Sequence, residues 1–250
     1  MNARQKEILK LIAQAKEISV ALLAETLGIS QVTLRKDLDV LAQDGYVKRH
    51  HGSVSVASED DVASRLLIGF EEKMLIATRA AALVNDGDTI MIESGSTCAL
   101  LAKVVAQNKS KVTIVTNSLF ISDFIRGFTN IKVVVLGGDF QPEARVMVGP
   151  ITALCAKQFF ASALFCGVDG MVEDFGFTVN DHLRATTVRD MAATAQNVYI
   201  LTESKKFFMR GAAAQLPFES VRGIVTDASI SLEIKALLEE KGLQVITDKE

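Results

Sequence analysis

The chain has 250 residues, which is enough for one large domain or for a small domain joined to a medium one, and we expect two. Apolar residues make up 49% and charged residues 23%, values typical of a globular chain with a sizeable core. A net charge of -3 and a pI near 5.7 argue against a non-specific nucleic-acid binder. The start, MNARQKEILKLIAQAKE, scatters charges where a signal peptide needs an apolar stretch, and no long uncharged apolar run follows. We therefore expect a cytoplasmic protein with no membrane span.

Three cysteines, an odd number, are present at Cys98, Cys155 and Cys166. They form no CxxC pair and no spacing with histidine that would suit zinc. We expect reduced packing residues, and neither a metal nor a cofactor.

The first residues in chain order predict three helices. Apolar residues at three-to-four spacing predict a helix over residues 4–14. A second helix follows the N-cap residue Ser19 and ends at Gly28. Ser30 then caps a third helix, in which three leucines share one face: Leu34, Leu38 and Leu41. Three helices with a tight glycine turn are typical of a helix-turn-helix.

A short hairpin is predicted next. Gly45 ends the third helix, and residues 46–56 read as two extended runs with Gly52 and Ser53 available for the turn. The polar, acidic stretch that follows is the best linker in the chain. We therefore divide the chain into a head (1–56), a linker (57–62) and a body (63–250). The head carries eight Lys or Arg and six Asp or Glu, a net charge of +2, which leaves -5 for the rest.

The body alternates between helical and extended patterns. A long amphipathic helix is predicted over about residues 65–84. Apolar runs rich in β-branched residues then recur at 89–93, 112–116, 131–138, 163–170, 197–203, 223–227 and 244–247. Apolar strands separated by helices indicate βαβ units. We expect an α/β domain with a mostly parallel sheet.

The head carries candidate groups for binding DNA. In a helix-turn-helix, the N-terminal end of the second helix of the motif enters the major groove. Here that end carries Ser30, Gln31, Thr33, Arg35 and Lys36. The hairpin adds a basic cluster that packing does not require: Lys48, Arg49, His50 and His51. The simpler alternatives are a solvated amphipathic helix and a charged loop.

The head resembles the DeoR family of bacterial regulators of sugar metabolism. The family signature is T-hydrophobic-R-[RK]-DL, followed by a leucine, a glycine and R-x-H-G. Residues 33–38 match its first part, and Arg49, His51 and Gly52 match its last. The resemblance implies a winged helix-turn-helix that binds an operator.

Small and hydroxyl-bearing residues follow the predicted strands of the body. Backbone N–H groups in a strand-loop-helix turn suit a phosphate, although serine and threonine also cap helices for structural reasons. Because ligands of parallel sheets bind at the carboxyl ends of the strands, we expect these residues to converge. They are Ser94, Gly95, Ser96, Thr97, Thr116, Asn117, Ser118, Gly137, Gly138, Asp169 and Gly170. Lys205 and Lys206, past a later strand, could reach such an anion.

The body resembles the DeoR-type sensor domain, which is similar in fold to ribose-5-phosphate isomerase. ESGST, TNSL, LGG, VMVGP and VDG resemble its motifs, and TESKKF stands where the family has DSSKF. The resemblance implies that Lys206 rather than Lys205 binds, and that the effector is a phosphorylated sugar or related metabolite. The chain departs from the family's E-A-x-x-K arrangement, because Arg184 and Val188 replace the acid and the base. Cys98 replaces a hydroxyl residue.

Three functions remain open from the sequence. The first is an effector-controlled repressor of carbohydrate-metabolism genes, which binds operator DNA and a small phosphorylated metabolite. Two half-sites would require a homo-oligomer, a dimer or a tetramer. The second is an isomerase-like enzyme with a DNA-binding appendage, for which His182 is the only histidine of the body and the candidate acids are Glu93, Asp139, Asp169 and Glu203. The third is a constitutive DNA-binding protein whose body serves only assembly.

Overall fold

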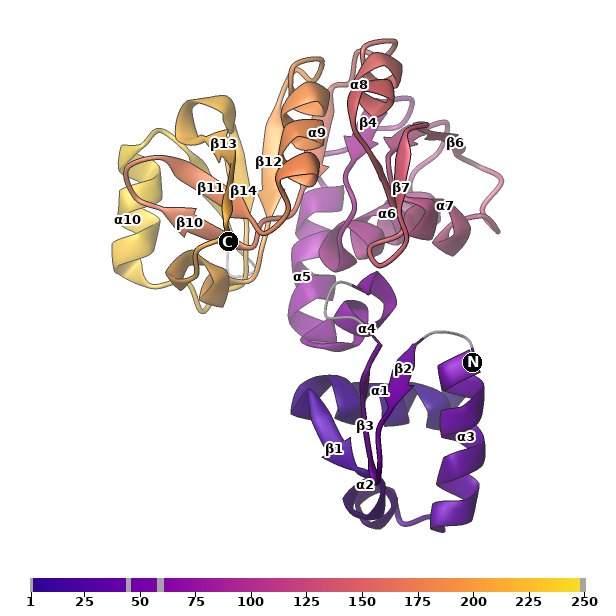
Figure 1. The fold of residues 1–250 in the computed structure, drawn as a ribbon. Coiled ribbons are helices and arrows are strands. Elements are labelled where there is room, and N and C mark those ends of the chain that lie inside the picture. Colours follow the sequence, from indigo (N-terminus) through magenta and orange to yellow (C-terminus); the bar gives the residue numbers. More distant parts are fainter. Residues whose placement is uncertain (1, 44–45, 58–60, 248–250) are drawn as a thin grey trace. The chain divides into compact units, whose positions relative to one another are not determined.

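The computed structural model describes residues 2–43, 46–57 and 61–247 (Figure 1). It divides into two compact units, Met1–Phe70 and Glu71–Glu250. The division falls beyond the predicted linker, of which residues 58–60 lie outside the described residues. Helix α4 (Val62–Leu67) packs against α1 (Ala3–Ala15), so this helix belongs to the first unit.

The first unit contains the three predicted helices, with the predicted caps at Ser19, Gly28 and Ser30. Gly45, which was predicted to end the third helix, lies outside the described residues. The Ser19 hydroxyl accepts a hydrogen bond from the N–H of Leu22 at 3.1 Å. Gly28 ends the second helix in the left-handed conformation with φ of 64°, which glycine adopts without strain. The helices and strands besides α1 and α4 are β1 (Glu17–Ser19), α2 (Val20–Leu27), α3 (Gln31–Gln43), β2 (Val47–Arg49) and β3 (Ser53–Val56).

The predicted hairpin is present, and it gains a third strand. β3 pairs antiparallel with β2 and, on its other edge, with β1. The sequence analysis did not predict β1, because three residues between two helices show no periodicity. Ser53 lies in β3 rather than in the turn, where Gly52 adopts a φ of 80°. The hairpin is therefore fastened to the helices through β1.

The second unit is built on the predicted parallel sheet. All seven apolar runs form strands, in the order β15-β14-β12-β9-β4-β5-β6, and every neighbouring pair is parallel. The strands are β4 (Thr89–Ile92), β5 (Thr113–Thr116), β6 (Lys132–Val135), β9 (Ala163–Cys166), β12 (Val198–Leu201), β14 (Gly223–Val225) and β15 (Gln244–Ile246). The fold class predicted from the sequence is confirmed.

Helices cover the sheet, because continuous apolar strands have two faces to bury. One core cluster joins strand residues such as Met91 and Leu164 to Val188 of α9 and Leu238 of α10. The helical segments are α5 (Phe70–Ala81), α6 (Ser96–Asn108), α7 (Leu119–Phe124), α8 (Pro150–Ala156), α9 (His182–Ala192), α10 (Leu232–Glu240) and the 3-10 turns η1 (Ser204–Phe208) and η2 (Phe218–Ser220).

Two sequence expectations about this unit are wrong in detail. The helix predicted over 65–84 is two helices, α4 and α5, because the chain is extended at Ile68 and left-handed at Gly69. The runs predicted to 138 and 170 are shorter, because the chain turns away into further strands. These strands form a hairpin of β7 (Asp139–Gln141) and β8 (Val146–Val148), and a small antiparallel sheet of β10 (Gly170–Val172), β11 (Gly176–Val179) and β13 (Ala213–Pro217).

The order of the strands reverses once, between β4 and β9. From β4 the chain adds β5 and then β6 on one side, whereas β9, β12, β14 and β15 are added on the other. In open parallel sheets, such a switch point opens a crevice at the carboxyl ends of the strands. Within the described residues, no helix is both long and apolar enough to cross a membrane.

Candidate functional site

The recognition helix α3 presents an exposed, polar N-terminal end. Its buried side carries Leu34, Leu38 and Leu41, so Gln31, Arg35 and Lys36 are exposed. Ser30 and Thr33 are also at this end, but they form the cap: the Ser30 hydroxyl accepts from the N–H of Thr33 at 3.2 Å and lies 3.0 Å from its hydroxyl. The structure thus gathers the five predicted residues at the end of α3.

Val32 lies at the same end, and the sequence analysis missed it. Its side chain is 67% exposed beside Gln31. An apolar side chain at such a position suits the methyl group of thymine in the major groove. The signal was available in the sequence, because Val32 falls outside the spacing of the three buried leucines.

A buried carboxylate fixes α3 against α1. Asp37 is 6% exposed and accepts hydrogen bonds from Arg4 Nε at 2.7 Å and from Gln5 Nε2 at 3.5 Å. The hydrogen bond and the charge of Asp37 raise the pKa of Arg4 above its ordinary value. An ion pair across two helices holds the recognition helix in one orientation, and Asp37 is therefore structural.

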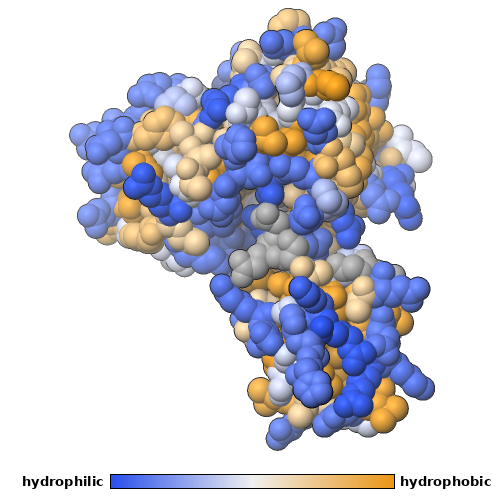
Figure 2. Space-filling model, in the orientation of Figure 1, coloured by the Kyte–Doolittle hydropathy of each residue, from blue (hydrophilic) through white to orange (hydrophobic). Residues whose placement is uncertain are grey.

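The wing lies against the recognition helix. Arg49 of β2 forms an ion pair with Asp39 of α3, and His50 Nε2 lies 2.9 Å from the hydroxyl of Ser55 across the turn. Lys48 and His51 are exposed beside them. Figure 2 shows hydrophilic side chains in a band across the visible face of the first unit. The predicted wing residues are all on the surface, and Arg49 connects them to α3.

Residues 94–97, which we call the phosphate loop because the sequence predicts that they bind a phosphate, follow the carboxyl end of β4. Asp169 follows β9, on the other side of the switch point. Gly95 precedes α6, and no side chain caps this helix, so its first N–H groups are not used by a cap. Ser96 and Thr97 are 4% and 7% exposed in its first turn. The aligned N–H groups favour an anion here.

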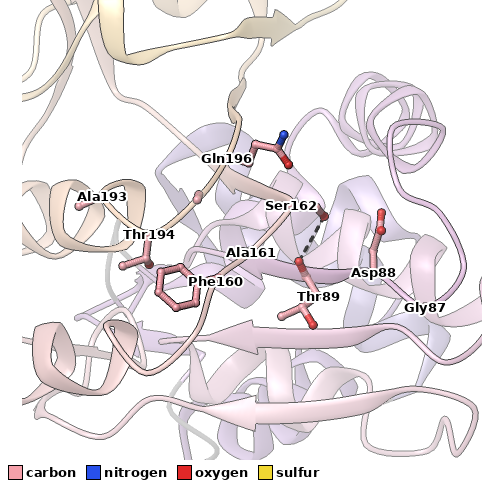
Figure 3. A pocket seen from close by; sticks show the side chains of 10 residues that line it. Gly87, Asp88, Thr89, Phe160, Ala161, Ser162, Ala193, Thr194 and Gln196 are labelled. Atoms are coloured by element: carbon pink, nitrogen blue, oxygen red, sulfur yellow. Dashed lines mark hydrogen bonds between the residues drawn. The ribbon is translucent and has the colours of Figure 1, made fainter.

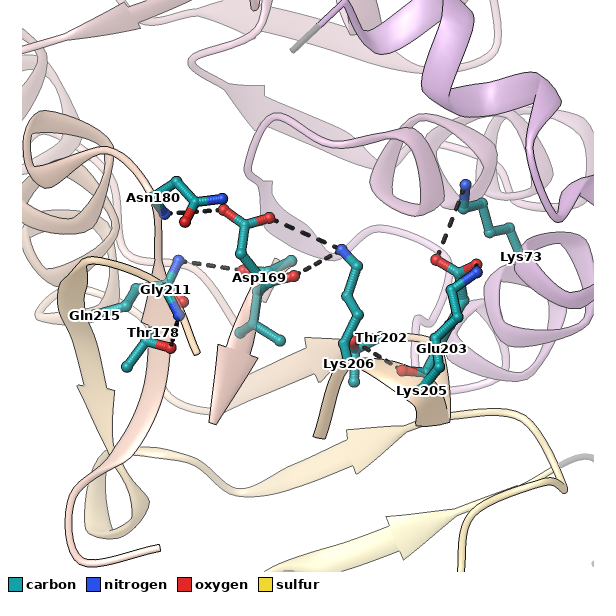
Figure 4. A network of polar contacts seen from close by, with 12 residues as sticks. Lys73, Asp169, Thr178, Asn180, Thr202, Glu203, Lys205, Lys206, Gly211 and Gln215 are labelled. Atoms are coloured by element: carbon teal, nitrogen blue, oxygen red, sulfur yellow. Dashed lines mark hydrogen bonds and ion pairs between the residues drawn. The ribbon is translucent and has the colours of Figure 1, made fainter. Parts of the chain in front are cut away.

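Three side chains hold the loop after β9, and two of them, Lys206 and Gln215, are labelled in Figure 4. Glu93, at the end of β4, accepts from the N–H of Gly167 at 3.3 Å. Lys206 donates to the carbonyl of Val168 at 2.7 Å, and its Nζ is 3.9 Å from Asp169 Oδ1. Gln215 Nε2 donates to the carbonyl of Gly167 at 3.1 Å. Side chains far apart in the sequence therefore meet at one loop.

The two neighbouring lysines have different surroundings. The Lys205 side chain is 63% exposed and lies 2.7 Å from Glu203 Oε1, whereas the Lys206 side chain is 19% exposed and turns toward the β9 loop. Lys73 of α5, which the sequence analysis missed, is buried with its Nζ 3.9 Å from Glu203 Oε2. It lies on the face of α5 that carries Ile76 and Ala80, and a lysine at a core position is the signal that identifies it.

Several predicted residues have local structural roles. The hydroxyl of Thr116 accepts from the N–H of Ser118, and the hydroxyl of Ser118 caps α7. Gly170 cannot carry a side chain, because a Cβ there would lie 2.2 Å from the carbonyl oxygen of Met209. At Gly138, after the edge strand β6, a Cβ would lie 1.9 Å from the Thr152 hydroxyl oxygen, whereas Gly137 beside it is exposed. These roles do not require a ligand.

Asn117 differs from its two neighbours. Its Nδ2 donates to the carbonyl of Met147 at 3.0 Å, while its Oδ1 is buried with no hydrogen-bond partner. The residue is 1% exposed at the end of β5.

The two departures from the family pattern have different surroundings. Val188 is buried in the core between α9 and the sheet. Arg184 Nε donates to Gln141 Oε1 at 2.9 Å, and Gln141 Nε2 donates to Asp181, the N-cap of α9. Burial opposes ionisation of Asp181, but hydrogen bonds from Arg184 and Gln141 and the charge of Arg184 outweigh it and lower its pKa. Arg184 thus links α9 to the β7-β8 hairpin.

All three cysteines are free thiols, and Cys98 and Cys166 are buried. Burial, and then the nearby Glu93 carboxylate, raises the pKa of Cys166 well above its ordinary value. Cys166 is therefore an unreactive packing residue.

A hollow of about 560 Å³ lies at the opposite edge of the sheet, at the amino ends of β4 and β9 (Figure 3). Two of its polar side chains already form hydrogen bonds with the backbone. The Ser162 hydroxyl donates to the carbonyl of Thr89 at 3.2 Å, and Asp88 accepts from the N–H of Asn85. Exposed Phe160 also lines it. The polar groups of the candidate effector site lie at the other edge of the sheet, at the carboxyl ends of the strands.

Comparisons with known proteins agree with both units. The DeoR-like helix-turn-helix domain matches residues 4–60, and the DeoR C terminal sensor domain matches residues 69–228. The HTH-type transcriptional repressor CsqR of Escherichia coli (strain K12) is 28% identical over 252 residues, covering 100% of this chain and 96% of the relative. The Glycerol-3-phosphate regulon repressor of the same strain is 24% identical, covering 97% of each. The HTH-type transcriptional regulator IolR of Bacillus subtilis (strain 168) is 25% identical, covering 92% of each.

Among solved structures, ribose 5 phosphate isomerase A from Neisseria gonorrhoeae is similar to part of the chain, with 15% identity and a TM-score of 0.40. The match covers 54% of this chain and 52% of that one.

A winged helix-turn-helix joined to an α/β sensor-type domain defines a DNA-binding transcription regulator. The chain belongs to the DeoR family, whose domain models match most of its length.

Proposed function

We propose that this protein is a transcriptional repressor whose affinity for operator DNA is controlled by a phosphorylated sugar or a related small metabolite. One observation carries the proposal. The uncapped start of α6 and the half-buried Lys206 lie at the carboxyl ends of strands on both sides of the switch point, where a small anion binds in such sheets. The names of the relatives support repression and a phosphorylated effector.

The effector would act by favouring one arrangement of the protein over another. A difference of about 1 to 3 kcal/mol in its affinity for the two arrangements gives a useful switch. We propose that this switch uses no cofactor or metal and that the protein acts in the cytoplasm, where bacterial operator DNA is found.

We also propose that the protein acts as a homo-oligomer, a dimer or a tetramer, because two heads read two half-sites. Exposed apolar side chains support a subunit contact in the body: Ile151 and Leu154 of α8 are 57% and 61% exposed, and Phe160 is 86% exposed. Light scattering of the purified chain tests it, and a monomer at micromolar concentration would contradict it.

We propose regulation rather than catalysis for the body. His182 is exposed at the start of α9, and the candidate acids Glu93, Asp169 and Glu203 are engaged with Gly167, Asn180 and Lys205. An isomerase needs a carboxylate base beside the substrate carbon. Assay of the purified protein for isomerisation of sugar phosphates checks this, and turnover would favour the enzyme.

The experiment begins by selecting bound fragments from genomic DNA to obtain an operator. That operator is then titrated with the protein, with and without individual sugar phosphates. We expect at least one sugar phosphate to shift the midpoint about fivefold or more. Operator binding that no phosphorylated metabolite alters would leave the constitutive DNA-binding protein as the function.

A further inference from the structure

Four buried side-chain atoms in the described part of the chain have no hydrogen-bond partner: Asn117 Oδ1, Thr152 Oγ1, Gln215 Oε1 and Thr226 Oγ1. A native protein contains few such atoms, and each one calls for an explanation. The two threonine hydroxyls can rotate to find partners, but an amide oxygen can only accept. The two amides are therefore the more demanding cases.

The orientation of the Gln215 amide is determined by its neighbour. Its nitrogen donates to the carbonyl of Gly167 at 3.1 Å. Exchanging the nitrogen and oxygen would set two acceptors against each other, so the unpartnered atom is the oxygen. The same reasoning holds for Asn117, whose nitrogen donates to the carbonyl of Met147.

Gln215 comes from the small antiparallel sheet and contacts the loop at the carboxyl end of β9. It is 1% exposed on β13, and its amide contacts Gly167, the first residue after β9. Lys206 donates to Val168, the next residue of that loop. Figure 4 shows Asp169 between Gln215 and Lys206, so the two side chains approach the same loop from opposite sides.

We propose that the Gln215 side chain accepts a hydrogen bond from a hydroxyl group of the effector. This inference rests on the proposed function, and it adds a binding residue from outside the parallel sheet. An acceptor oxygen repels a phosphate, whereas the N–H groups of α6 and the ammonium of Lys206 attract one. Gln215 Oε1 therefore binds the uncharged, hydroxyl-bearing part of the same molecule.

Asn117 offers a second acceptor of the same kind. It follows β5, and the strand order β9-β4-β5 places the phosphate loop after β4 between the ends of the strands that carry Gly167 and Asn117. Strands are about 4.8 Å apart, so the two ends are separated by roughly 10 Å. Donors in the middle with acceptors on each side match a polyol phosphate, and a site built to bind hydroxyls rejects analogues that lack them.

The test compares Gln215→Met with the wild-type chain. Methionine has a similar length and no acceptor oxygen. Binding of ribose 5-phosphate, fructose 6-phosphate and inorganic phosphate is measured by calorimetry on the full chain. We expect the Kd of the sugar phosphate that binds to rise about tenfold in the variant, and that of inorganic phosphate to stay within about twofold.

The matched control is Gln196→Met, an exposed glutamine at the amino edge of the sheet, which should bind like the wild type. Circular dichroism checks the folding of each variant. Gln215→Leu, which also lacks the acceptor, takes the place of a methionine variant that does not fold.

Two results would overturn the inference while the proposed function stands. Unchanged sugar-phosphate binding would mean that water alone satisfies the oxygen, and equal losses for sugar phosphate and inorganic phosphate would mean that Gln215 only holds the β9 loop. A wild-type chain that binds none of the sugar phosphates would overturn the proposed effector together with this inference.

Discussion

The two units present their functional groups in opposite ways. In the first unit, the candidate DNA-binding side chains come from one helix and one hairpin within residues 30–51, and most are exposed. In the second unit, the candidate effector groups come from the ends of several strands and are mostly buried. A long, charged duplex is read by a protruding surface, whereas a small metabolite has to be enclosed. The size of the ligand thus explains why one site is local in sequence and the other is not.

The charges differ in the same way. Arg35 and Lys36 lie on an exposed face, where water and salt screen their charges. In the body, Lys73 pairs with Glu203, and Lys206 lies near Asp169. Buried charges need such partners because desolvation is costly. An anion at Lys206 would therefore compete with protein groups, whereas Arg35 and Lys36 have no ion-pair partner to displace among the described residues.

The largest expected effect is a loss of stability confined to the first unit when one of its core side chains is shortened. Leu38 is fully buried in the first unit, and Leu38→Ala should cost about 2 to 5 kcal/mol of its stability. Denaturant unfolding followed by circular dichroism measures this loss, and operator binding should fall with it. Leu38→Met, which keeps the volume, is the control. Loss of sugar-phosphate binding in Leu38→Ala would show that the body depends on the head.

The next effect is on effector binding by the second unit. Lys206→Met should weaken sugar-phosphate binding by about 10- to 100-fold, because a hydrogen bond to a charged group is lost. Operator affinity without effector should not change. The neighbouring Lys205→Met is the matched control, since the Lys205 side chain is 63% exposed. Equal losses in both variants would contradict the assignment of Lys206 to the crevice.

A smaller effect is expected on operator binding by the first unit. Lys36→Ala should weaken operator binding and, if it contacts phosphate, reduce the log-log salt slope by about one unit, because one fewer counterion is released. Electrophoretic titrations at several salt concentrations measure the slope. Lys10→Ala, an exposed lysine on α1, should leave both quantities unchanged. An unaltered slope with unaltered affinity would remove Lys36 from the interface.

The smallest expected effect is on the acid stability of the body. Burial opposes ionisation of Asp227, but hydrogen bonds from the N–H and hydroxyl of Ser204 and the N–H of Ser229 outweigh it and lower the pKa of Asp227. A carboxyl whose pKa is lower in the folded state stabilises the fold above its ordinary pKa, and this contribution is lost as the pH falls.

Asp227→Asn should therefore reduce stability at neutral pH, and the difference from the wild type should shrink below about pH 4. Thermal unfolding of both proteins at a series of values between about pH 3 and about pH 7 measures the difference. Ser204→Ala removes the hydroxyl donor to this carboxylate, so it should also reduce stability at neutral pH by an amount that shrinks as the pH falls. A difference that stays constant with pH would show that the carboxylate charge is not what stabilises this loop.

Periodicity in the sequence was sufficient for the three helices of the head, their caps at Ser19 and Gly28, and all seven parallel strands. The helices and strands depend on which residues face a core, and the spacing of apolar residues along the chain indicates which ones do. The family motifs also singled out Lys206 over Lys205, and the structure turns Lys206 toward the β9 loop.

Only the tertiary structure decided the rest. Strand β1 is three residues long and exists because β3 pairs with it, and β13 joins β11 across an intervening helix and strand. Gln215 looked like an ordinary position until the fold brought it beside Gly167. Lys73 was recognisable as a lysine at a core position, but its partner Glu203 is 130 residues away and is given only by the fold. The physical reason is that strand pairing and buried polar contacts join residues far apart in the chain, so no local pattern records them.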